Sequence, residues 1–128
     1  MTPCSRQVQV QEKVDSLTEQ FLRRAGADVI RLREMNERIR HGDLTALEEV
    51  ERVAHSIHGA GALFGFPGVS AAGGAIEHLV EEGMANVSAF SATPESAVLR
   101  RLFECTEHLA YQVDAAAQTE PSSAGMFQ

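Results

Sequence analysis

The sequence predicts an all-α fold, an up-down antiparallel four-helix bundle. Apolar residues recur every three or four positions along most of the chain, which is the period of a helix with one buried face. No alternation of apolar and polar residues is long enough to build a sheet. Glycine, proline and helix-capping residues divide the pattern into four segments with short connections, and such connections place consecutive helices antiparallel.

The first segment begins near residue 11 and ends before Gly42. Cations in its last turn, followed by a glycine, are typical of a helix C-terminus. Gly26 interrupts the segment, so a bend or a short extra N-terminal helix stays open as an alternative to one continuous helix. The expected apolar stripe consists of Val14, Leu17, Phe21, Ala25, Leu32, Met35 and Ile39.

The second segment runs from about Leu44 to Phe64, and the third from Pro67 to about Gly83, with Gly65 as the break between them. Proline suits the first turn of a helix, which supports the start of the third segment. The stripe of the second segment is Leu47, Val50, Ala54, Ile57, Gly61 and Phe64, and the stripe of the third is Val69, Ala72, Ile76 and Leu79. These spacings of three and four are those of helices packed in a bundle.

A loop is expected over 84–92, and the run Thr93-Pro94-Glu95 then predicts the start of the fourth helix, with a cap, a first-turn proline and an early acid. This helix carries Val98, Leu102, Cys105, Leu109 and Val113. We therefore expect a flexible N-terminus over 1–10, one bundle domain over 11–117 and a disordered tail over 118–128.

The composition fits one small domain and excludes several kinds of partner. The 128-residue chain has 44% apolar residues and a formal net charge of −7. Because nucleic acid requires a basic face, it is not expected as a partner. Cys4 and Cys105 lie far apart and give no disulfide framework. No signal peptide or membrane-length apolar run is present, so we expect a cytoplasmic protein without membrane contact.

Two histidines stand close together in the second segment, and a helical wheel separates them. His55 lies about 100° from Ala54, outside the apolar stripe, whereas His58 lies at its boundary. Gly59 and Ala62 fall on the same side as His55. A glycine costs about 1 kcal/mol in a helix relative to alanine, so its presence beside an exposed imidazole indicates room for a partner.

Glu77 is expected opposite His55. His55 precedes the break at Gly65 by ten residues and Glu77 follows it by twelve, so in antiparallel helices their heights differ by about 3 Å. The carboxylate could accept a hydrogen bond from one ring nitrogen and leave the other as a nucleophile. Gly73 and Gly74 lie one turn earlier and are expected to keep the neighbouring surface low.

An exposed, oriented imidazole can serve as a general base, a metal ligand or a phosphoryl acceptor. A general base needs a substrate pocket, and no motif of a phosphate loop, a catalytic triad or a zinc protease is present. A metal site could combine His55 and His58 with Glu77 or His78, but two helical histidines are a weak signal, so no metal is expected. A phosphoryl acceptor needs only an accessible nitrogen.

The pattern His55-x-Ile57-x-Gly59, with Gly65 ten residues after the histidine, resembles the signature of the histidine-containing phosphotransfer (HPt) domain family. The string AHSIHGAGALFGF is most similar to the phosphorylated N-terminal module of chemotaxis-type histidine kinases. The resemblance implies a four-helix bundle in which His55 is phosphorylated and Gly59 leaves room for the docking partner. By the same resemblance Glu77 orients the histidine.

The resemblance also implies a role in bacterial two-component signalling. The chain would be a phosphorelay intermediate that accepts a phosphoryl group from a receiver-domain aspartyl phosphate and passes it to another receiver. Its partners would be receiver domains and a hybrid histidine kinase. It would be a phosphoryl carrier and not an enzyme with an ATP-binding domain, and its receiver partner would supply magnesium, so no cofactor of its own is expected. We expect a monomer.

One position departs from the family pattern. The family usually has lysine or arginine three residues after the phosphorylated histidine, and this chain has His58. Because a histidine is only partly charged near neutral pH, the role of that cation could be weakened or depend on pH. This departure keeps an alternative open, in which a degenerate HPt-like bundle binds a kinase or receiver as a regulator without phosphotransfer.

Overall fold

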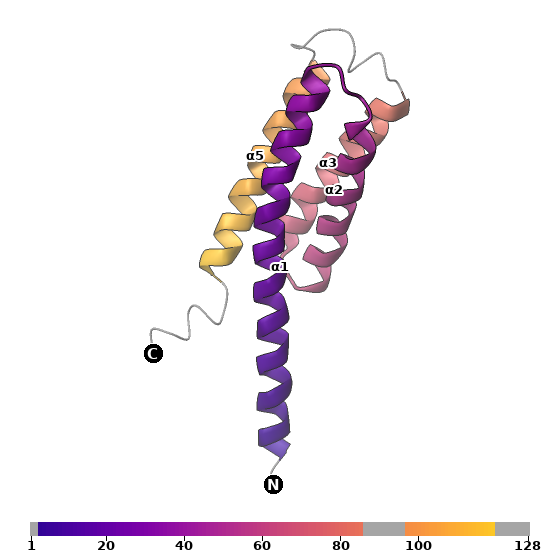
Figure 1. The fold of residues 1–128 in the computed structure, drawn as a ribbon. Coiled ribbons are helices and arrows are strands. Elements are labelled where there is room, and N and C mark those ends of the chain that lie inside the picture. The colour runs from indigo at the N-terminus through magenta and orange to yellow at the C-terminus, as the bar shows by residue number, and fades with distance from the viewer. Residues whose placement is uncertain (1–2, 86–96, 120–128) are drawn as a thin grey trace.

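The computed structural model describes residues 3–85 and 97–119, and this part of the chain is helical, without a strand (Figure 1). The predicted all-α four-helix bundle is confirmed. Each helix packs against two neighbours, in the cyclic order α1, α2, α3, α5. The helices are α1 (Pro3–Arg40), α2 (Ala46–Leu63), α3 (Pro67–Ala85) and α5 (Ala97–Gln118).

Helix α1 is continuous and longer than the sequence indicated. It runs through Gly26 without a break, and it begins at Pro3, where a flexible segment over 1–10 was expected. The extension is understandable, because no glycine or proline lies between Pro3 and Gly26 and many of the residues there are good helix formers. Buried residues on both sides of Gly26, at Ala25 and Val29, hold the helix against the bundle.

The ends of the other helices differ from the expected limits by a few residues. Helix α3 continues to Ala85, and α5 ends at Gln118. The predicted start of the fourth helix at 93–95 lies outside the described residues, as do most of the expected loop over 84–92 and the last nine residues of the expected tail over 118–128.

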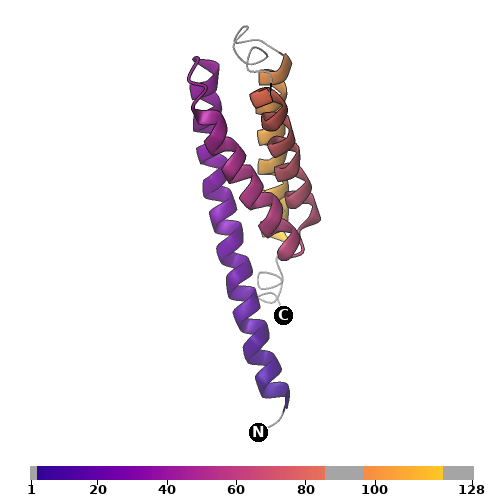
Figure 2. The same ribbon diagram turned by 90° about the vertical axis from the view of Figure 1, so that its right-hand side faces the viewer.

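The core is a layer of aliphatic side chains shared by all four helices. The stripe predicted for α2 is buried from Leu47 to Gly61. In α5 the buried face is centred on Leu102 and Leu109, while Cys105 is only half-buried. Two members of the α1 stripe are not core residues, because the side chains of Val14 and Leu17 stay partly exposed. Val14 borders the last turns of α5 and Leu17 those of α2, so both lie near the end of the bundle beyond which α1 continues alone (Figure 2).

The α2–α3 turn fixes the pairing of these two helices. Gly65 adopts a positive φ of 82°, and the Phe66 N–H donates to the carbonyl of Gly61 at 2.8 Å. A Cβ on Gly61 would lie 2.9 Å from the backbone nitrogen of Ser70, so the two backbones approach closely just before the turn. None of the described helices has the length and apolar character needed to cross a membrane.

Candidate functional site

His55 lies on the outer face of α2 and contacts Glu77 of α3. The side chain of His55 is 72% exposed, whereas that of Glu77 is only 17% exposed. Nδ1 of His55 lies 2.6 Å from Oε2 of Glu77. A carboxylate can only accept here, so Nδ1 carries the hydrogen that is donated, and Nε2 is left as the free ring nitrogen. The imidazole is therefore both oriented and open to solvent.

Close packing of α2 on α3 sets this contact. Gly73 is buried, and a Cβ there would lie 3.1 Å from the backbone nitrogen of His58 and 3.2 Å from the carbonyl oxygen of Ala54. At this separation Glu77, one turn further along α3, reaches His55 directly. The structure thus corrects the expectation for Gly73, which lies in the helix interface and not on a lowered outer surface.

His58 is an exposed residue of α2 whose ring lies against α3. Its Nδ1 lies 2.9 Å from the carbonyl oxygen of Ser70, and the Ser70 hydroxyl donates to the carbonyl of His58 at 2.7 Å. Since a carbonyl only accepts, Nδ1 of His58 is the donor in this contact and Nε2 is the free nitrogen. A Cβ on Gly74 would lie 2.9 Å from Nδ1 of His58, so Gly74 provides space for the ring and does not keep an outer surface low.

Ser70 is the site residue that sequence reasoning missed. It directly follows the core residue Val69, as Glu77 directly follows the core residue Ile76. The register argument that placed Glu77 beside His55 could therefore have placed Ser70 beside His58. The signal was hidden because one of the contacts uses the Ser70 backbone carbonyl and another uses the His58 backbone carbonyl, and the residue type predicts neither.

The face beyond His55 is open. No atom lies within 4 Å of a Cβ built on Gly59, and Ala62 is exposed on the same side. Leu63, at the end of α2, is 80% exposed. A partner that approaches His55 from this side meets a bare helix backbone and small or apolar side chains.

The opposite side of His55 is acidic. A hollow of about 460 Å³ is lined by Glu48, Glu51, Arg52, His55, Glu77 and Met84. Desolvation raises the pKa of Glu51, and a hydrogen bond to Glu81 with repulsion from that carboxylate raises it further, while His55 acts in the opposite direction. Glu51 and Glu81 face each other one turn away from His55 and Glu77, and sequence analysis did not single them out.

His41 and His78 contact residues one turn away on the same stretch of chain. Nδ1 of His41 lies 2.8 Å from the carbonyl oxygen of Glu37, and Nε2 of His78 lies 3.3 Å from Oε2 of Glu82. Over residues 3–85 and 97–119, no three histidine, cysteine or acidic side chains are arranged to hold a metal ion.

Comparison with known families gave a match that spans most of the chain. A family model described as "Hpt domain" matches residues 10–119. Comparisons with curated proteins and with solved structures gave no match.

Proposed function

The chain belongs to the Hpt domain family, whose members carry phosphoryl groups in two-component phosphorelays, and from this premise we propose that His55 is the residue that carries the phosphoryl group. The observation that supports this best is the contact between Nδ1 of His55 and Glu77 at 2.6 Å on a side chain that is 72% exposed. An exposed imidazole with one nitrogen held and the other free is what phosphoryl transfer requires.

The transfer begins with an aspartyl phosphate on a receiver domain. The lone pair of Nε2 attacks phosphorus, the N–P bond forms, and the P–O bond to the aspartate breaks so that the carboxylate leaves with its electron pair. Nδ1 keeps its hydrogen throughout the transfer, and this N–H donates a hydrogen bond to the Glu77 carboxylate. The positive charge that develops on the ring is stabilised by that carboxylate. The reverse sequence passes the group to the aspartate of a second receiver.

The surroundings of His55 suit a large partner that brings the remaining chemistry. Gly59 and Ala62 leave space on the side from which a receiver would approach. The receiver would supply magnesium to neutralise the phosphoryl oxygens, so the chain would need no cofactor of its own. A hybrid histidine kinase is the expected source of the group, with receiver domains on both sides of the transfer.

His58 would assist from the position where the family has a basic residue. Its Nδ1 is committed to the Ser70 carbonyl, so Nε2 is the atom left to contact a phosphoryl oxygen once protonated. It lies three residues after His55 on the same helix, a spacing at which side chains are neighbours. In this arrangement Ser70 and Gly74 hold His58, and His58 contacts the phosphoryl group.

The decisive variant is His55→Gln, which removes the nucleophile and keeps a polar side chain. Incubated with a phosphorylated cognate receiver, the wild-type chain should gain an acid-labile label and the variant should gain none. His78→Gln is the matched control, since His78 is an exposed histidine on α3, and it should label like the wild type. Labelling of His55→Gln would contradict the assignment. A wild-type chain that binds the receiver and never labels would instead indicate a regulator without phosphotransfer.

A further inference from the structure

The N-terminal half of α1 projects beyond the other three helices (Figures 1 and 2). Helix α1 has 38 residues, whereas α2 has 18. The chain turns back at the end of α2, where Phe64 and Phe66 stack on Phe21 at centroid distances of 5.3 and 6.1 Å. Leu17 and Gln20 still line a hollow with Ile57 and Ala60 of α2. The N-terminal part of α1 continues past the end of α2 (Figure 1).

An apolar line runs down this projecting part. It consists of Val10, Val14 and Leu17, which are 59%, 44% and 43% exposed, and we refer to these three residues as the α1 seam. Their spacings of four and three continue into Phe21, and this is the repeat by which two helices pack along one seam. The seam therefore has the pattern of a helix–helix contact, and its three side chains stay 43–59% exposed although α2 and α5 border its upper end.

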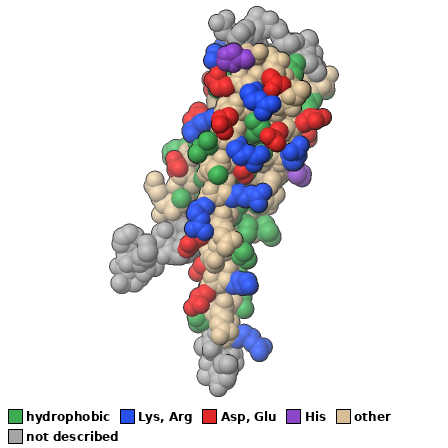
Figure 3. Space-filling view, viewed as in Figure 1, with side chains coloured by type: hydrophobic (Ala, Val, Ile, Leu, Met, Phe, Trp, Pro, Cys, Tyr) green, Lys and Arg blue, Asp and Glu red, His purple; other side chains and the backbone are tan. Residues whose placement is uncertain are grey.

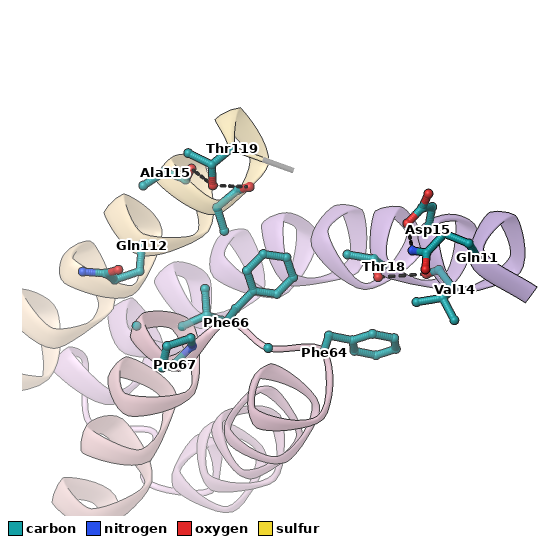
Figure 4. Close-up of a pocket in the computed structure, with 14 residues that line it drawn as sticks. Gln11, Val14, Asp15, Thr18, Phe64, Phe66, Pro67, Gln112, Ala115 and Thr119 are labelled. Atoms are coloured by element: carbon teal, nitrogen blue, oxygen red, sulfur yellow. Dashed lines mark hydrogen bonds between the residues drawn. The ribbon is translucent and has the colours of Figure 1, made fainter. Parts of the chain in front are cut away.

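The upper end of the seam opens into a recess of about 610 Å³ (Figure 4). Its walls come from three elements: the projecting half of α1, the α2–α3 turn and the last turn of α5. The residues labelled in the figure that form these walls include Val14 and Thr18, Phe64 and Phe66, and Ala115 and Thr119. Val14 is the seam residue that lines this recess, where apolar side chains of the turn and of α5 mix with the polar side chains of Asp15 and Gln112.

The charges around the seam favour a second copy of the same segment. At about 100° per residue, the acids Glu12, Asp15 and Glu19 lie about 135° or more away from the centre of the seam. The positions that flank it are Gln11, Lys13, Thr18 and Gln20. Figure 3 shows hydrophobic and charged side chains alternating around the projecting part. Although the chain carries a net charge of −7, two copies can meet along this line with Asp15, which lines the recess beside Val14, as the acid nearest to it.

We propose that the projecting half of α1 pairs with the same segment of a second copy, so that the two α1 seams bury each other in an antiparallel, two-fold symmetric helix pair. Such an interface uses one patch twice and needs only self-complementarity. The proposed α1–α1 contact is antiparallel, as is the contact that α1 makes with α2 on the other side of the α2–α3 turn. The monomer expected from the sequence would then be the dissociated form.

The pairing leaves the phosphotransfer site free. His55 contacts Glu77 of α3, whereas Leu17 of the α1 seam lies beside Ile57 and Ala60, on the side of α2 that faces α1. A dimer would thus present two copies of His55 on separate bundles. The proposal concerns an interface and does not rest on the role proposed for His55, so each can fail without the other.

The test compares Val14→Glu with Val8→Glu by light scattering on the full chain. Both residues are partly exposed on the same helix, but Val8 lies about 120° around the helix from Val14. Between about 10 µM and about 1 mM, mass action should bring the wild type and Val8→Glu to twice the chain mass of 13.9 kDa. Val14→Glu should stay at one chain mass, and Leu17→Glu should behave in the same way.

Helicity and melting temperature establish that each variant is folded, which is expected because the replaced side chains are already partly exposed. Phosphoryl transfer to His55, measured per chain, should be the same in all variants. A wild type that stays monomeric over the whole range would overturn the proposal and leave the α1 seam to a different occupant. Equal weakening by Val8→Glu and Val14→Glu would also overturn it.

Discussion

Glu77 is the residue whose chemistry depends most on its position in the bundle. It is largely buried beside the exposed His55, and one of its carboxylate oxygens is used by Nδ1 of that ring. A carboxylate in this place selects the tautomer with a free Nε2, and in the proposed transfer it would stabilise the charge that the ring gains. Its effect should therefore appear in the transfer rate and not in the docking of the partner.

Replacement of Glu77 by alanine should slow phosphoryl transfer by about 10- to 100-fold, the usual effect of losing the group that orients a functional histidine. The rate is measured from quenched time points of transfer from a phosphorylated receiver, and circular dichroism checks the fold. Glu82→Ala is the control, because Glu82 is an exposed acid on the same helix. An unchanged rate in Glu77→Ala would remove the orienting role.

His58 can be tested by giving it a permanent charge. His58→Lys should preserve or increase the transfer rate at pH 8, because lysine stays protonated there whereas most histidine does not. The rates of the wild type and the variant are compared at pH 8. A clear loss of rate in the variant would show that the ring contributes something that a cation cannot replace, such as its fixed contact to Ser70.

At the residue scale, a contact could be predicted from the sequence where it depends only on the register between α2 and α3. The placement of Glu77 beside His55 needed only the turn at Gly65 and a rise of about 1.5 Å per residue. The same register could have placed Ser70 beside His58, but the contact of the His58 ring to the Ser70 carbonyl could not be predicted, because it depends on how far α3 lies from α2. Helical periodicity reports which face of a helix is buried, and it does not report the distance between two helices.

At the scale of the elements, the α2–α3 pair is the tightest part of the bundle, and its glycines explain why. Gly61 and Gly59 lie two residues apart on α2 in opposite situations. A Cβ on Gly61 would lie 2.9 Å from the Ser70 nitrogen and 3.0 Å from the Ser70 Cα, both of them backbone atoms, while a Cβ on Gly59 would meet open space. One glycine permits close packing, and the other leaves the outer face of the helix bare.

Gly61→Ala should therefore destabilise the fold by about 1–3 kcal/mol, because α2 and α3 must move apart to admit the methyl group. Gly59→Ala should be neutral or stabilising by up to about 1 kcal/mol, since alanine is the better helix former. Urea unfolding followed by circular dichroism gives both values. Equal stabilities of the two variants would contradict the close packing at Gly61.

The α1 helix marks the limit of element prediction from one sequence. Its apolar period was recognised, but Val14 and Leu17 were assigned to the core and are partly exposed. The period shows that a residue belongs to the apolar face of a helix, and whether a neighbouring helix reaches that height is set by where the chain turns back. The turn at Gly65 was predicted. To know which residues of α1 lie level with that turn, the register between α1 and α2 is also needed, and the sequence pattern does not report it.

Across the whole molecule, carboxyl groups with lowered and with raised pKa values have opposite effects on how the free energy of unfolding depends on pH. Arg33 holds the pKa of Glu107 below its ordinary value through a hydrogen bond, so that contact contributes stability that is lost as the pH falls through the lowered pKa. Asp28 acts in the opposite sense. Burial raises its pKa, although Arg31 and Arg24 partly oppose the shift. The folded state therefore binds the Asp28 proton more tightly than the unfolded state does.

Asp28→Asn should for this reason make the protein more stable at pH 7, where the wild type keeps a poorly solvated charge. The gain should shrink as the pH falls through the raised pKa, and it should vanish below the ordinary pKa, where Asp28 is protonated in both states. Urea unfolding from pH 7 to acid pH measures the difference. Glu34→Gln removes one negative charge from an exposed position of the same helix and thus isolates the effect of net charge. Equal gains in both variants would mean that relief of the overall negative charge, and not burial of Asp28, governs the response.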